Sequence, residues 1–86
     1  MVSYKFYLKQ NLKSGNEGYY LNSNNSEAEN IQSLTETLNL NYEEIYNIYK
    51  ICNGIFFKGL NLNEFGYFKN EDDALKASMM FNLILN

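Results

Sequence analysis

The start of the chain contains the pattern that most restricts the fold, a regular alternation of side chains. Alternate positions from Val2 to Leu8 are apolar, whereas the intervening positions from Ser3 to Lys9 are Ser, Lys, Tyr and Lys. A side-chain period of two is typical of a β-strand with one buried face. Residues 2–9 are therefore predicted to form a half-buried strand.

Three further runs of residues predict additional strands. A turn-forming cluster at residues 10–17 is followed by the β-prone run 18–21. Later in the chain, the aromatic runs 55–60 and 65–69 flank a link rich in Gly and Asn. Runs of this kind separated by turn residues are typical of hairpins, so the sequence predicts two of them.

Capping residues predict three helices. Ser26 and Asn41 are each followed three positions later by Glu, the spacing of a capping box, and Asn70 precedes three acidic residues that suit the positive end of a helix. Gly54 is predicted to end the second helix through a left-handed cap. The element order ββααββα then predicts one α+β domain over residues 1–86, with an antiparallel four-stranded sheet and helices on one face.

The second and third predicted helices have more apolar surface than one core stripe requires. Tyr42 and Tyr46 flank the core face of the second helix. Leu75, Met79 and Leu83 recur every four residues along the third, away from its core stripe, and we expect them to mediate self-association as a homodimer. The predicted core positions are Ile31, Leu34 and Leu38, then Ile45, Ile48, Tyr49 and Cys52, then Ala74, Ala77, Phe81 and Ile84.

The residue types that most catalytic and metal sites need are absent or have a structural explanation. The chain has no His, and its one thiol, Cys52, is predicted to be a small core residue without a base to activate it. The acidic pairs 43–44 and 72–73 stand in first turns of predicted helices, where capping and the helix dipole account for them. We expect neither catalysis nor a cofactor nor a metal site.

The same residues predict a cytoplasmic protein. The first ten residues contain no apolar segment of the kind found in signal peptides, and no apolar run approaches the 18 or so residues of a membrane span. A single Cys also suits a reducing compartment. We therefore expect no contact with a membrane.

Charge is distributed unevenly along the chain. The net charge is −3, but residues 26–53 and 71–86, which are predicted to be mainly helical, have −4 and −2. The strand regions 1–25 and 54–70 have +2 and +1. An acidic helical side with exposed Tyr predicts a protein-interaction module that binds a partner with a basic surface. The predicted contact residues are Tyr42, Tyr46, Glu27, Glu36 and Glu43.

The basic strands support an alternative prediction, binding of single-stranded nucleic acid. An open sheet face that presents Lys and Tyr can attract phosphates and stack bases. Absence of Arg removes the preferred bidentate phosphate ligand, which weakens this alternative. The residues concerned are Lys5, Tyr7 and Lys9 on the first strand and Lys58 and Lys69 on the second hairpin.

Small size, acidity and the lack of catalytic groups resemble the small stand-alone proteins of phages and mobile elements, among them anti-CRISPR inhibitors that block basic nucleic-acid channels. The resemblance is one of composition and covers no motif. It implies an inhibitor that occupies a basic protein surface.

Overall fold

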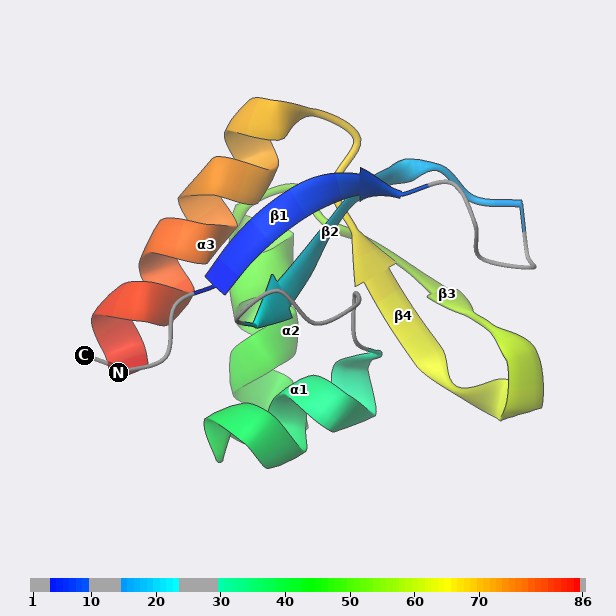
Figure 1. The fold of residues 1–86 in the computed structure, drawn as a ribbon. Coiled ribbons are helices and arrows are strands. Elements are labelled where there is room, and N and C mark those ends of the chain that lie inside the picture. The colour runs from blue at the N-terminus through cyan, green and yellow to red at the C-terminus, as the bar shows by residue number, and fades with distance from the viewer. Residues whose placement is uncertain (1–3, 10–14, 24–29, 86) are drawn as a thin grey trace.

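Two β-hairpins and three helices make up the part of the chain that the computed structural model describes, residues 4–9, 15–23 and 30–85. In chain order the elements are β1 (Tyr4–Lys9), β2 (Gly18–Ser23), α1 (Ile31–Leu38), α2 (Tyr42–Ile51), β3 (Ile55–Lys58), the 3₁₀ turn η1 (Leu60–Leu62), β4 (Glu64–Tyr67) and α3 (Glu71–Leu85). The β1–β2 ribbon packs against α3, and β2 also contacts β4 of the second hairpin (Figure 1).

The predicted four-stranded sheet with helices on one face is wrong. β1 pairs with β2 and β3 with β4, and the described parts of the two hairpins share one isolated antiparallel bridge, between Tyr19 and Phe68. The adjacent residues Tyr20 and Leu21 point to opposite faces of β2, and both are buried. The Tyr67 ring lies 5.6 Å from the Tyr20 ring and covers that face. β2 is thus covered on both sides, and β4 diverges from it beyond the bridge (Figure 1).

Two of the three predicted helix caps are confirmed. The Asn41 side chain accepts a hydrogen bond from the Glu44 N–H at 2.8 Å, and the Glu44 carboxylate accepts one from the Asn41 N–H at 3.4 Å. The Asn70 side chain accepts from the Asp73 N–H at 3.0 Å. These bonds satisfy backbone donors that have no partner within the helix, which fixes where α2 and α3 begin.

The predicted start of the first helix is wrong. α1 begins at Ile31, and its cap is Asn30, whose side chain accepts a hydrogen bond from the Ser33 N–H at 2.7 Å. Ser26 lies outside the described residues. Asn caps a helix as well as Ser does, and Asn30 directly precedes Ile31, the first fully buried residue of the helix.

Tyr49 of α2 lies at the centre of the core. Its ring stacks on Phe68 with centroids 4.7 Å apart and planes 11° apart. Gly54 and Gly66 both approach this ring, and a Cβ atom added to Gly66 would lie 2.6 Å from Tyr49 Cε1. Gly54 was predicted to supply the left-handed cap of α2, but the left-handed residue is Asn53, with φ 59°. Gly54 instead permits a close approach to Tyr49.

The predicted core stripes are confirmed apart from one position. The exception is Ile84, which is half exposed in the last turn of α3, beyond Phe81, the last α3 residue in the core. Burial also raises the pKa of the Cys52 thiol, and its Sγ lies 3.7 Å from Met80 Sδ, as suits an unreactive core residue. The buried stripe residues are Ile31, Leu34, Leu38, Ile45, Ile48, Tyr49, Cys52, Ala74, Ala77 and Phe81.

Candidate functional site

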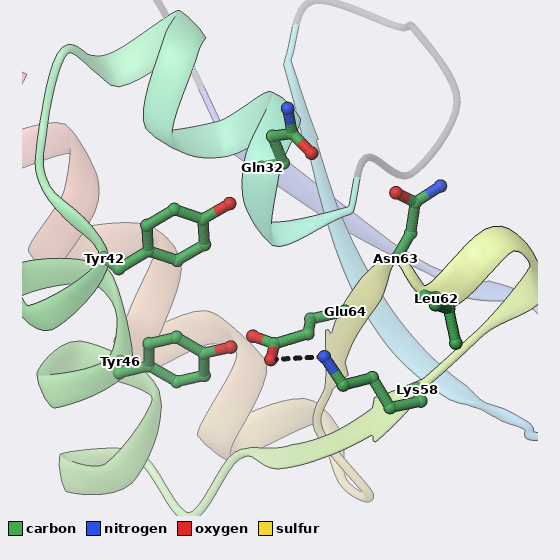
Figure 2. Close-up of a pocket in the computed structure, with 7 residues that line it drawn as sticks. All are labelled: Gln32, Tyr42, Tyr46, Lys58, Leu62, Asn63 and Glu64. Atoms are coloured by element: carbon green, nitrogen blue, oxygen red, sulfur yellow. Dashed lines mark hydrogen bonds and ion pairs between the residues drawn. The ribbon is translucent and has the colours of Figure 1, made fainter.

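A hollow of about 470 Å³ opens between α1, the first half of α2 and the β3–β4 hairpin (Figure 2). Its wall is formed by side chains from consecutive parts of the chain, α1, α2 and the β3–β4 hairpin with its η1 turn. We call this hollow the tyrosine groove. It is lined by Gln32, Tyr42, Tyr46, Lys58, Leu62, Asn63 and Glu64.

Two stacked tyrosines form one wall of the tyrosine groove. Tyr42 and Tyr46 stand four residues apart on α2, and their ring centroids are 6.1 Å apart with planes inclined by 23°. Tyr42 is 45% exposed. The Tyr46 ring packs against the Phe56 ring with centroids 4.5 Å apart, and the Phe56 centroid lies 5.3 Å from that of Tyr49 in the core. The structure therefore brings together two predicted contact residues and holds Tyr46 from behind by a run of aromatic rings.

A cross-strand ion pair forms the opposite wall. Lys58 and Glu64 face each other in the β3–β4 register, with Lys58 Nζ 2.8 Å from Glu64 Oε1. The Tyr46 hydroxyl points toward the Glu64 carboxylate (Figure 2). Both charged side chains remain in contact with solvent, at 62% and 35% exposure. Exposed pairs of this kind stabilise a fold by only about 0–1 kcal/mol, so the ion pair can open at little cost.

Leu62 projects at the tip of the β3–β4 hairpin. Its φ is 63° and that of Asn61 is 59°, so two consecutive residues adopt the left-handed conformation. That conformation costs a residue with a Cβ roughly 1–2 kcal/mol, and Asn tolerates it better than Leu does. The Leu62 side chain is 82% exposed, so it recovers almost none of this cost through burial.

The predicted acidic contact residues do not line the tyrosine groove. Glu36 and Glu43 are both exposed, and they belong to α1 and α2, the two helices that border it. Glu27 lies outside the described residues. Sequence reasoning missed the groove role of Leu62 and Glu64. Lys58 and Glu64 stand at positions that can pair across the predicted hairpin, and this spacing could have predicted their ion pair. No residue pattern predicts that Leu62 adopts the left-handed backbone conformation.

The residues of the nucleic-acid alternative do not share one sheet. Positions 5, 7 and 9 lie in β1, where their backbone pairs with Asn22, Tyr20 and Gly18, but the side chains at those three positions lie outside the described part. Lys69 is exposed, and Lys58 belongs to the other hairpin. Binding of single strands stays a prediction. Absence of binding to any oligonucleotide at low salt would contradict this prediction.

A second exposed feature runs along α3. Leu75, Met79 and Leu83, which we call the α3 ridge, are 47%, 57% and 79% exposed. Ile51 at the end of α2 is exposed beside a hollow of about 410 Å³ between the two helices. That hollow is lined by Ile51, Cys52, Lys76, Met79, Met80 and Leu83.

Within the ranges that the structure describes, no group of three or more His, Cys, Asp or Glu side chains is placed to hold a metal ion, and no helix is long and apolar enough to span a membrane. Comparison of the chain with protein-family models, curated proteins and solved structures finds no match.

Proposed function

We propose that this protein acts by binding another protein through the tyrosine groove, and that the partner's contact surface is basic. The observation that carries the proposal is Leu62, an exposed apolar side chain held in a costly backbone conformation beside a stacked tyrosine pair. Strained backbone persists only where the surrounding structure holds it in place, and residues of this kind cluster at active sites and ligand-binding sites.

The side chains around the tyrosine groove suit protein recognition. Tyr buries a large apolar area with few rotatable bonds and keeps a polar tip, so it loses little entropy on contact. Tyr42 is exposed and Tyr46 is supported by Phe56, so the pair is preorganised for such a contact. Leu62 supplies an apolar side chain on the other side of the groove. A partner that covers all three side chains buries apolar surface that is exposed in the free protein.

Charge around the tyrosine groove favours a basic partner. Glu36, Glu43 and Glu44 are exposed on α1 and α2, where the described residues include a single cation, Lys50. An acidic surface of this kind speeds encounter with basic surfaces and disfavours acidic ones. A basic surface that otherwise binds nucleic acid would be blocked by this contact, which would make the protein an inhibitor.

Site-specific crosslinking in cells tests this proposal. A photoreactive p-benzoylphenylalanine at position 42 or 62 is expected to capture the same partner, because both side chains line the tyrosine groove. The matched control is position 47, which is exposed on the same helix as Tyr42 but does not line the groove. Capture from position 47 as efficient as from 42 and 62, or no capture from either groove position, would contradict the proposal.

Charge reversal then tests the basic character of the captured partner. The double variant Glu36→Lys, Glu43→Lys is expected to bind about tenfold more weakly at low salt, with less loss as salt increases. The control Glu17→Lys, Glu71→Lys makes the same change in net charge at exposed positions that do not belong to α1 or α2, the helices that border the groove. Equal weakening by both double variants would mean that only net charge matters.

We also propose that the α3 ridge mediates a homodimer. The ridge extends four residues to either side of Met79, with Leu75 before it and Leu83 after it. A two-fold axis at Met79 would therefore place Leu75 of one copy against Leu83 of the other, as a self-complementary interface requires. The exposure of all three side chains supports this proposal.

Substitution of Met79 with Lys is expected to convert a concentration-dependent dimer into a monomer. Met79 is exposed, so the change should leave the melting temperature of the monomer almost unchanged while placing two like charges at the symmetry axis of the dimer. Light scattering after size exclusion measures the mass directly. A wild-type protein that stays monomeric at millimolar concentration would overturn the dimer proposal.

A further inference from the structure

The tyrosine groove combines an aromatic wall with a carboxylate and several neutral acceptors. Tyr46, Lys58 and Glu64 line this groove and also an adjoining hollow of about 450 Å³ on the side of Phe56 and Phe57. The Tyr46 ring and the Glu64 carboxylate therefore stand between two open spaces. Lys50 also lines the adjoining hollow, so a positively charged side chain from a partner is expected to enter through the tyrosine groove.

This arrangement matches the chemistry of a guanidinium group. Guanidinium is planar, stacks on aromatic rings, and presents five N–H donors that fit a carboxylate in a bidentate manner. Figure 2 shows the Tyr42 and Tyr46 hydroxyls, the Glu64 carboxylate and the Asn63 side chain around one space. An ammonium group would fit less well, because it is a point charge that cannot lie flat on Tyr46 while bridging both oxygens of Glu64.

In the free protein the Glu64 carboxylate already forms an ion pair with Lys58, and this ion pair is easily broken. Lys58 reaches Glu64 through one contact of 2.8 Å, and its side chain is 62% exposed. A single exposed ion pair of this kind contributes little to stability. Lys58 therefore acts as an internal competitor for the site.

We infer that the tyrosine groove receives an arginine side chain of the partner, whose guanidinium stacks on Tyr46 and displaces Lys58 from Glu64. The inference rests on the proposed function and gives the chemistry of its partner. It predicts that Glu64 and Lys58, which form one ion pair, have opposite effects on the affinity for arginine. Glu64 binds the arginine, and Lys58 opposes that binding.

Titration of the isotopically labelled protein with Nα-acetylarginine methylamide, followed by NMR, tests the inference. The amide shifts are expected to cluster at groove residues, and the citrulline and lysine analogues should bind more weakly. Glu64→Gln should reduce the affinity about tenfold, because it removes a charge-assisted contact. Lys58→Gln should raise it about two- to fivefold, because it removes the competitor. Both variants break the same ion pair, so a purely structural effect would move the affinity in the same direction.

Three results of the titration would overturn the inference: no binding of the arginine derivative, equal binding of the lysine derivative, or equal weakening by Glu64→Gln and Lys58→Gln. Crosslinking separates this failure from failure of the proposed function. If positions 42 and 62 capture a partner whose affinity is unchanged by Glu64→Gln, the arginine site is wrong and the proposed function stands. If the arginine derivative binds with the expected variant pattern and no partner is captured, the arginine site stands and the proposed function fails.

Discussion

Replacement of Gly66 with Ala is expected to destabilise the protein by about 2–3 kcal/mol and to lower the melting temperature by roughly 10–20 °C. The added Cβ would lie 2.6 Å from Tyr49 Cε1 and 3.0 Å from its Cζ. The Tyr49 ring cannot easily move away from the added Cβ, because it is fully buried and stacks on the Phe68 ring with centroids 4.7 Å apart. Close-packed cores absorb an extra methyl group only by moving side chains or backbone. Thermal unfolding followed by circular dichroism measures the change.

A double-mutant cycle identifies the cause of this destabilisation. In a Tyr49→Leu background, which removes the ring that Gly66 approaches, Gly66→Ala should cost much less than in the wild type. An equal cost in both backgrounds would mean that the alanine acts elsewhere. A melting temperature within about two degrees of the wild type would contradict the packing described for Tyr49, because overpacking of a core costs 1–3 kcal/mol.

Local features of this fold could be predicted from the sequence because they depend on residues close together in the chain. Asn41 and Asn70 cap helices through contacts three residues away. The stripes that face the core follow from the helical period, so Ile45 and Phe81 are buried as predicted. Tyr42 and Tyr46, one turn apart on α2, stack for the same reason.

Features that depend on contacts distant in the sequence could not be predicted. The predicted four-stranded sheet is wrong because the described parts of the two hairpins pair only at the bridge between Tyr19 and Phe68, residues 49 positions apart whose pairing no alternation pattern reveals. The tyrosine groove likewise depends on the approach of the β3–β4 hairpin to α2, which requires glycine at 66. The left-handed conformation of Leu62 was missed because residue preferences favour Gly or Asn there.

Replacement of Leu62 with Gly is expected to stabilise the free protein and weaken its binding. Glycine adopts a φ of 63° without steric cost, so about 1–2 kcal/mol of strain is relieved, less about 0.5–1 kcal/mol for the greater freedom of glycine in the unfolded chain. The net gain of about 0.5–1 kcal/mol should raise the melting temperature by roughly 2–8 °C. Loss of the exposed side chain removes an apolar contact at the groove, which should weaken partner binding about tenfold.

The variant Leu62→Ala separates the two effects. Alanine retains a Cβ and therefore the backbone strain, but it lacks most of the apolar side chain. It should bind the partner as weakly as Leu62→Gly does, with a melting temperature close to that of the wild type. A gain in stability from alanine equal to that from glycine would show that the backbone of residue 62 is not strained.

The central claim is that the tyrosine groove is the contact surface of this protein, and affinity for the partner captured from positions 42 and 62 tests it most directly. Measured at equilibrium for the wild type, Leu62→Gly and Leu62→Ala, the affinity is predicted to fall about tenfold for both variants. Both variants must remain folded, as their melting temperatures will show. An unchanged affinity in folded Leu62→Gly and Leu62→Ala would contradict the claim.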